Sequence, residues 1–260
     1  MSRPLAPSPL FGPAPIARHT LYLEDLAPGA DRLTVEGPEA DHARKVKRLE
    51  PGQFVTLLNG RGLVADAEVM EARRALVLRI ADERVAERTA PAVDVWSATP
   101  KGPRSSDLVD ALSQVGAASW RALDSARSVV EPGDNKMARL ERVAHEACKQ
   151  SLRAWTLDIH PMGRFDDALA PEPGVAIVLA DASGEPYRAK GAARIRLIVG
   201  PEGGFTEPEL QRARAAGAAM CRFGPHVMRI EVAAPVACAV VLDAEARIHP
   251  PSNAAPSQAG

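Results

Sequence analysis

The chain has few aromatic residues and few cysteines, and its charges nearly cancel. Aromatic side chains make up 4% of the 260 residues, which argues against a base-stacking surface for single-stranded nucleic acid. A formal net charge of −1 excludes a global basic field, so nucleic-acid binding would need a local cluster of cations. Cys148, Cys221 and Cys238 are widely spaced, which indicates neither a disulfide framework nor a Cys-x-x-Cys metal site.

Long apolar runs and targeting signals are absent as well. No run approaches the length of a membrane-spanning helix, and the N-terminus lacks the hydrophobic region of a signal peptide. We therefore expect a cytoplasmic protein with no membrane partner. Residues 1–17 are rich in proline, and residues 250–260 are rich in Pro, Ser, Asn, Ala and Gly, so we expect both to be flexible tails.

Two different patterns fill the remaining chain, which predicts two domains, 18–90 and 91–249. The first contains short strand-like runs separated by turn residues, which predict a small β-barrel, and a helix-like stretch at Pro38–Leu49. Asn59-Gly60 is a signal for a two-residue hairpin. The expected strands are His19–Leu23, Arg32–Val35, Phe54–Leu58, Gly62–Val69 and Ala75–Ile80.

Residues 91–249 alternate strand and helix, which is typical of an α/β domain with a mainly parallel sheet. We expect helices at Ser105–Val115 and Lys136–Arg153, another from Thr206, and a last apolar helix interrupted by Pro235. The expected strands are Val93–Ala98, Ser119–Leu123, Leu157–His160, Val175–Ala180, Ile195–Val199 and Met220–Phe223.

A glycine-rich turn joins the strand Ile195–Val199 to the helix that starts at Thr206. Glycines between positions 200 and 204 permit positive φ and a close approach of the backbone to a ligand. Thr206 and Glu209 have the spacing of a capping box. No G-x-G-x-x-G or Gly-Lys-Ser/Thr spacing is present, which disfavours a phosphate site. An ordinary strand-to-helix turn remains the alternative reading.

This turn, Gly200–Phe205 followed by Thr206–Glu209, resembles the signature turn of the RsmE family. That family comprises SPOUT-class, S-adenosylmethionine-dependent methyltransferases that methylate N3 of a uridine in 16S ribosomal RNA. The segment Phe223–Ala233 resembles the family's second cofactor segment, and a weaker likeness extends from about Arg18 to Ile248. The resemblance implies a PUA-like β-barrel that binds RNA, followed by an α/β domain with a trefoil knot, in a homodimer that needs no metal.

In such enzymes three loops meet at the cofactor, and here the matching segments are Leu179–Gly184, Gly200–Gly204 and Phe223–Arg229. The resemblance thus assigns S-adenosylmethionine contacts to Leu179, Ala180, Val199, Gly200, Pro201, Glu202, Gly203, Phe223, Gly224, Val227 and Met228. His145 and Cys148 stand at i and i+3, but no further ligands are spaced to complete a metal site, so we interpret them as packing residues.

Methylating N3 of uracil requires loss of its proton and in-line attack of nitrogen on the methyl group. Arg229 is our candidate for anchoring the uracil or a phosphate, and Glu231 for orienting Arg229 or acting as base. A static surface ion pair is the alternative. The family's usual Arg-Thr-Glu-Thr is here Arg229-Ile230-Glu231-Val232, and His226 replaces an arginine. These departures suggest an alternative function, that of a divergent RNA-binding and cofactor-binding paralogue with another RNA substrate or no catalysis.

Three groups of residues are candidates for RNA contacts. The first surrounds the short helix of the first domain, where a solvated helix face is the alternative: His42, Arg44, Lys45, Lys47 and Arg48. The second is Lys101 and Arg104, in a loop that carries basic residues in the family. The third is Glu146, Gln150 and Arg153, which share a helix face and match a family segment close to the active site; a surface ion pair is the alternative.

Overall fold

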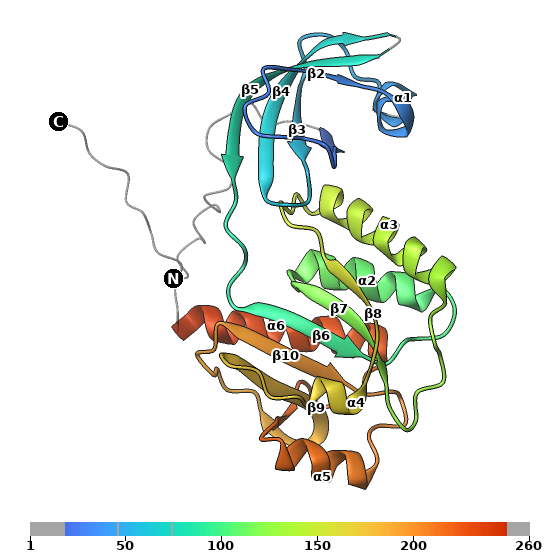
Figure 1. The fold of residues 1–260 in the computed structure, drawn as a ribbon, viewed down its shortest axis with the longest axis vertical. Helices are drawn as coiled ribbons and strands as arrows, with labels where there is room; N and C mark the ends of the chain where they lie inside the picture. Colours follow the sequence, from blue (N-terminus) through green and yellow to red (C-terminus); the bar gives the residue numbers. More distant parts are fainter. Residues whose placement is uncertain (1–18, 46, 74, 249–260) are drawn as a thin grey trace, which may run out of the picture. The chain divides into compact units, whose positions relative to one another are not determined.

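The computed structural model describes residues 19–45, 47–73 and 75–248. The predicted tails at 1–17 and 250–260 lie outside the described residues. The chain forms two compact units, each coloured by sequence in Figure 1. The first comprises the described residues up to Arg88 together with His145–Thr156, and the second comprises Thr89–Ala144 and the described residues from Leu157 onward.

The first unit is built on a five-stranded sheet with strand order β1-β3-β4-β5-β2. Its elements are β1 (His19–Tyr22), β2 (Arg32–Val35), α1 (Gly37–Lys45), β3 (Phe54–Leu58), β4 (Leu63–Ala72) and β5 (Leu76–Val85). β1 runs parallel to β3 and the other pairs are antiparallel. Alternate residues of these strands, such as Val55 and Leu57, are fully buried in the core, which is the period expected of a half-buried strand.

The hairpin between β3 and β4 has a longer loop than the predicted two-residue turn. Asn59 to Gly62 separate the strands because the Asn59 side chain organises the loop: its Oδ1 accepts hydrogen bonds from the backbone N–H of Arg61 (2.8 Å) and of Leu63 (3.0 Å). The returning segment His145–Thr156 packs here, since Gly60 O accepts a hydrogen bond from Thr156 N at 2.9 Å.

The second unit contains a six-stranded sheet in which every pair is parallel, with strand order β11-β9-β10-β6-β7-β8. The strands are β6 (Ala92–Ser97), β7 (Ser119–Asp124), β8 (Asp158–Arg164), β9 (Val175–Pro186), β10 (Arg194–Val199) and β11 (Ala219–Arg222). The expected parallel sheet is confirmed, with β10 in its interior. β9 is longer than predicted, because Glu185 and Pro186 still pair with β11 after a register shift.

Helices cover both faces of this sheet (Figure 1). They are α2 (Arg104–Val115), α3 (Asp134–Gln150), α4 (Phe165–Ala168), α5 (Glu207–Ala215) and α6 (Ile230–Ile248). Ile195, Leu197 and Val199 of β10 share one apolar cluster with residues of α2, α3 and α6, whereas Ile198 joins a second cluster with residues of α4 and α5. The alternation along β10 therefore produces a three-layer arrangement.

Cys148, Cys221 and Cys238 are buried, and none of the three forms a disulfide. Within the described part of the chain, no group of three or more His, Cys, Asp or Glu side chains could hold a metal ion. None of the described helices is long and apolar enough to cross a bilayer.

Candidate functional site

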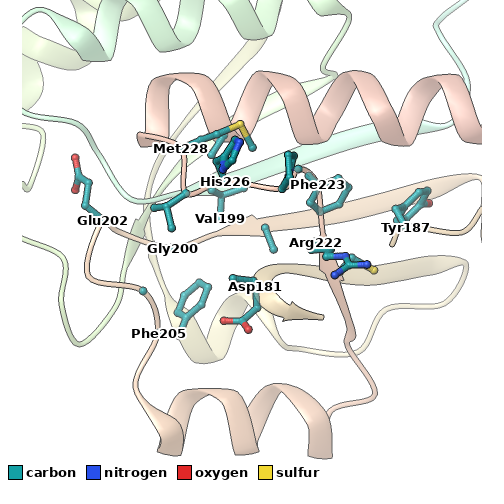
Figure 2. Close-up of a pocket in the computed structure, with 18 of the residues that line it drawn as sticks. Asp181, Tyr187, Val199, Gly200, Glu202, Phe205, Arg222, Phe223, His226 and Met228 are labelled. Atoms are coloured by element: carbon teal, nitrogen blue, oxygen red, sulfur yellow. The ribbon is translucent and has the colours of Figure 1, made fainter. Parts of the chain in front are cut away.

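A cavity of about 900 Å³ lies in the second unit, where the carboxyl ends of β9, β10 and β11 meet at one edge of the parallel sheet. Figure 2 shows the lining residues between two helices. The three segments predicted to meet do lie together here. The lining residues are Ala180–Ala182, Pro186, Tyr187, Val199–Phe205, Cys221–Met228, Ala233 and Val240.

The turn after β10 is shaped by two glycines for different reasons. A Cβ at Gly200 would lie 2.9 Å from the ring of Phe205, so only a residue without a side chain fits. Gly204 has φ of +68°, the left-handed region that glycine adopts freely. Positive φ was also permitted at Gly200 and Gly203, but neither is among the positive-φ glycines, and for Gly200 the constraint is steric.

A buried carboxylate holds this turn to its surroundings. Glu209 is 2% exposed, and its Oε2 accepts hydrogen bonds from Thr206 N and Oγ1, both at 2.8 Å, which confirms the predicted capping box. Its Oε1 accepts a hydrogen bond from Ala126 N at 2.8 Å. Arg127 in the same loop donates to Gly203 O at 2.5 Å. The loop after β7 is therefore tied to the cavity wall.

The wall mixes charges of both signs with apolar and aromatic surface. Asp181 and Glu202 supply carboxylates, and Arg222 and His226 supply nitrogen donors. Figure 2 shows Phe205 and Phe223 on different sides of the cavity, with Tyr187 beyond Arg222. Such a site suits a ligand with cationic, anionic and apolar parts.

All but one of the predicted cofactor residues line this cavity. The exception is Leu179, which is fully buried in the cluster with Ile198 and Phe205. Alternation along β9 explains the difference, because neighbouring strand residues face opposite sides of the sheet.

Glu231 pairs with a cation other than the one predicted. Its Oε1 lies 3.5 Å from Arg104 Nη1, which is also 4.0 Å from Oε1 of the cavity residue Glu202. The Glu231 side chain is 11% exposed, and its Oε2 is buried without a hydrogen-bond partner in the described part of the chain. Arg229 is exposed, and no ion pair to it occurs among the described residues. Arg104 thus joins the cavity rim to the start of α6.

The basic residues around α1 differ in what their side chains do. His42, Lys45 and Arg48 are exposed, and Lys45 forms an ion pair with Asp41 at 3.2 Å. Lys47 instead donates a hydrogen bond to the carbonyl oxygen of Thr20, and burial lowers the pKa of its amine. The side chain of Arg44 lies outside the part that the structure describes. Lys101, in the second unit, is exposed.

The predicted group Glu146, Gln150 and Arg153 belongs to the first unit, whereas the cavity belongs to the second. Glu146 is paired with Lys149 at 2.8 Å. Lys149 also contacts Glu39 of α1 at 3.2 Å. Burial alone would lower the pKa of Lys149, but its hydrogen bonds to Glu146 and Glu39 raise it above the ordinary value.

Several cavity residues were not predicted. Asp181, Gly204 and His226 lie inside the predicted segments and Phe205 directly follows one, so the segments located them without naming them. Tyr187 and Arg127 had no signal in the sequence. Tyr187 reaches the cavity only because β9 extends to Pro186. Arg127 does not line the cavity, but it contacts the carbonyl oxygen of the lining residue Gly203 because Glu209 holds its loop.

Comparisons with known proteins agree with this architecture. Residues 87–242 match the family profile described as an RNA methyltransferase domain, and residues 35–80 match an RNA methyltransferase PUA domain. The ribosomal RNA small subunit methyltransferase E proteins of Mycobacterium bovis and Mycobacterium tuberculosis are 31% identical over 234 residues, covering 85% of this chain and 89% of the relative. The protein of that name from Bacillus subtilis is 26% identical, with 78% of this chain and 87% of the relative covered.

Solved structures share the fold. A probable rRNA-methyltransferase from Porphyromonas gingivalis superposes with a TM-score of 0.77 at 26% identity, covering 88% of this chain and 99% of that chain. Ribosomal RNA small subunit methyltransferase E from Neisseria gonorrhoeae, bound to S-adenosyl methionine, has a TM-score of 0.76 at 23% identity over 88% of this chain and 97% of that chain. The predicted PUA-like domain followed by a SPOUT-type α/β domain is confirmed. The chain therefore belongs to the ribosomal RNA small subunit methyltransferase E family.

Proposed function

We propose that this protein methylates N3 of a uridine in 16S ribosomal RNA, with S-adenosylmethionine as methyl donor. The observation that carries the proposal is the three-loop cavity whose rim, through Arg104, adjoins the Glu231 carboxylate with its unpaired buried oxygen. The names of the relatives and the S-adenosyl methionine bound to the Neisseria gonorrhoeae protein support the same activity.

The cavity residues fit S-adenosylmethionine in size and chemistry. A volume of about 900 Å³ is within the range of small-molecule sites. Gly200 leaves no room for a Cβ, which keeps the backbone beside the cavity clear of side chains. Carboxylates suit the cationic ammonium and sulfonium groups, and Arg222 or His226 suits the carboxylate of the donor. When bound, this cofactor supplies an electrophilic methyl group.

The chemistry left to the protein is positioning and removal of a proton. Uracil N3 carries a hydrogen that must leave before the nitrogen lone pair can attack carbon. We assign Glu231 Oε2 to accept that proton. This oxygen is buried without a hydrogen-bond donor, which costs free energy, and the uracil N3–H would supply the missing donor. Arg104 holds the other oxygen and orients the carboxylate. Arg229, which is exposed and lies two residues before Glu231 in the sequence, would contact a phosphate or the uracil carbonyl.

RNA would be held by cations of the first unit and by the loop before α2. His42, Lys45, Arg48 and Lys101 are exposed and available for phosphate contacts. Arg44, Lys47, Glu146, Gln150 and Arg153 remain part of the proposal, Lys47 with its amine already bonded to Thr20. With ribosomal RNA as substrate, the protein would act in the cytoplasm.

We propose that a second copy of the chain packs against the outer face of α6, forming a homodimer. One face of this helix is buried by Ala234, Ala237 and Val241, whereas Val232 is 47% exposed and Val240 is 39% exposed. Val240 also lines the cavity, so a dimer through this face would place each site beside the partner. Light scattering of wild type and of Val232→Asp tests this: a dimer that becomes monomeric is expected, and a monomeric wild type would contradict it.

The function is tested by nucleoside mass spectrometry of 16S rRNA from cells that lack the protein. N3-methyluridine should disappear, return with the wild-type chain, and fail to return with Glu231→Gln or Arg229→Ala. Its persistence in the deletion strain would show that the substrate assignment is wrong. In vitro, Glu231→Gln should lower kcat by about 10²- to 10⁴-fold. The matched control is Glu207→Gln, an exposed carboxylate on α5, which should retain activity.

The alternative function, binding of cofactor and RNA without catalysis, was suggested by Ile230 and Val232. Ile230 is 2% exposed within the core cluster, and neither residue lines the cavity. These two departures from the family sequence therefore leave the cavity wall unchanged, which favours retained catalysis, whereas the departure at His226 lies in the wall itself. A protein that binds S-adenosylmethionine and RNA but transfers no methyl group would support the alternative.

A further inference from the structure

A second buried carboxylate of the α/β unit has no part in the proposed chemistry. Glu245, near the end of α6, is 1% exposed. Its Oε1 accepts hydrogen bonds from Tyr187 Oη and from Lys190 N, both at 2.6 Å, and its Oε2 accepts one from Gly191 N at 3.0 Å. Burying a carboxylate costs desolvation free energy, and the hydrogen bonds from three donors offset that cost. Glu245 therefore holds these donors in place.

Tyr187 connects this carboxylate to the cavity. The residue directly follows β9 and lines the cavity, and its ring stacks on Phe223 with centroids 5.9 Å apart and planes at 26°. Phe223 follows β11, the parallel neighbour of β9, so the two rings stand at the ends of paired strands. Figure 2 shows Phe223 and Tyr187 on the same side of the cavity, away from Glu202. The pair forms an aromatic wall.

The hydroxyl of Tyr187 stays protonated in this arrangement. Burial first, and then the hydrogen bond to Glu245, raise the pKa of Tyr187 far above its ordinary value. The hydroxyl therefore remains a donor to the carboxylate at every pH at which the protein would work. Lys190 Nζ lies 6.0 Å from the centroid of the Tyr187 ring, on the loop that Glu245 also holds.

From these contacts we infer that Glu245 is a positioning residue for the cofactor cavity, acting through Tyr187 and the loop to Gly191 to keep the Tyr187–Phe223 wall in place for S-adenosylmethionine. The inference rests on the proposed function. Glu245 touches neither cofactor nor substrate. Its loss should let the Tyr187 side chain rotate and the loop move, so that the wall must be ordered again when the cofactor binds.

The test is calorimetric measurement of the Kd of S-adenosylmethionine without RNA, together with Tm, for Glu245→Gln, Tyr187→Phe and the double variant. In Glu245→Gln an amide N–H₂ would face the backbone N–H donors, and the Kd should rise about 5- to 30-fold. Tyr187→Phe keeps the ring and removes only the hydroxyl, so it should fold and raise the Kd about 3- to 10-fold. The double variant should bind about as weakly as Glu245→Gln alone, because both changes break one connection.

Asp94→Asn is the matched control for loss of a buried carboxylate in the same unit. Asp94 is 8% exposed, accepts hydrogen bonds from Ser119 Oγ at 2.6 Å and Arg194 Nε at 2.5 Å, and does not line the cavity. The Asp94→Asn substitution should lower Tm and leave the Kd for S-adenosylmethionine within about twofold of the wild-type value. The positioning role is overturned if Glu245→Gln, like this control, lowers Tm but leaves the Kd unchanged. It is also overturned if the effects of Glu245→Gln and Tyr187→Phe on the free energy of binding add in the double variant. If wild type binds no S-adenosylmethionine, the proposed function and the inference fail together.

Discussion

Gly200 is the cavity residue at which the structure tolerates the least added volume. A Cβ there would lie 2.9 Å from Phe205, which itself lines the cavity. Overpacking of this kind costs about 1–3 kcal/mol, and here either the Phe205 ring or the turn itself would have to move. We expect Gly200→Ala to weaken S-adenosylmethionine binding about 10-fold or more, measured by calorimetry.

Gly133 is the matched control for this substitution. It belongs to the same unit, has no positive φ, and a Cβ there would meet nothing within 4 Å. Gly133→Ala should leave the affinity unchanged. Equal affinity of Gly200→Ala and wild type would show that the turn is not part of the cofactor wall.

At the scale of single residues, the position of the cavity could be predicted from the sequence, but some of the side-chain contacts around it could not. Glycine turns at strand ends are visible in a sequence, so the positions around Gly200 and Gly224 could be predicted. Leu179 does not line the cavity, because the side of the sheet that a strand residue faces depends on its register. The partner of Glu231 was missed because Arg104 is 127 residues away in the chain. No local pattern reports such a pairing.

Helix α5 is secured at its start by Glu209, which should make stability depend on pH. Burial alone would raise the pKa of Glu209, but hydrogen bonds from Ala126 and Thr206 lower it. A depressed folded-state pKa contributes stability above the unfolded value of 4.5, and this contribution is lost as pH falls through the folded value. Glu209→Gln should therefore cost about 1–3 kcal/mol at pH 7.

Thermal unfolding followed by circular dichroism at several pH values checks this expectation. The difference in Tm between wild type and Glu209→Gln should narrow as pH falls below about 4.5, where the carboxyl becomes protonated. A difference that stays constant with pH would contradict an ionised Glu209 in the cap.

Elements were more predictable than contacts. Apolar runs and turn residues located the start of every strand of the parallel sheet to within one residue, and the capping box located the start of α5. The short helix α4 was missed because four residues carry no periodicity. The end of β9 was missed because pairing with β11, not the sequence of β9, extends it.

On the scale of the whole molecule, the chain returns to its first unit with His145–Thr156. Lys149 ties this segment to α1, and the side chains of Lys149 and Glu39 are 11% and 21% exposed. The pKa of Lys149 is raised in the folded protein. The stabilisation from its ion pair is therefore fully present below the unfolded-state pKa of 10.5, and it is lost only as pH rises through the folded-state pKa. Lys149→Ala should thus cost about 1–3 kcal/mol at pH 7.

Lys45→Ala is the control, because its ion pair with Asp41 is solvent-exposed, with side chains 73% and 46% exposed. It should cost less than about 0.5 kcal/mol. Hydrogen exchange resolves the effect, since Lys149→Ala should lower protection in α1 and in residues 145–156 together. Loss of protection in only one of these segments would show that they are not coupled.

Binding of 16S rRNA fragments should follow the exposed cations. Lys45→Ala with Arg48→Ala should weaken RNA binding and reduce the slope of log K against log salt by about 1–2, while the Kd for S-adenosylmethionine stays unchanged. Arg79→Ala, an exposed arginine of β5 paired with Glu68, is the control. Equal loss in both variants would point to general charge rather than this surface.

Helix α6 carries Glu231 in its first turn and Glu245 in its last, fourteen positions apart along a rod that rises about 1.5 Å per residue. The proposed proton acceptor, Glu231, and the proposed support of the Tyr187–Phe223 wall, Glu245, therefore lie on the same helix. A small translation or rotation of α6 would disturb both proton removal and S-adenosylmethionine binding. A change in one of the surrounding loops would affect only one of these two steps. Amino-acid substitutions during evolution should consequently be rare at Glu231 and Glu245, as well as at the buried positions between them.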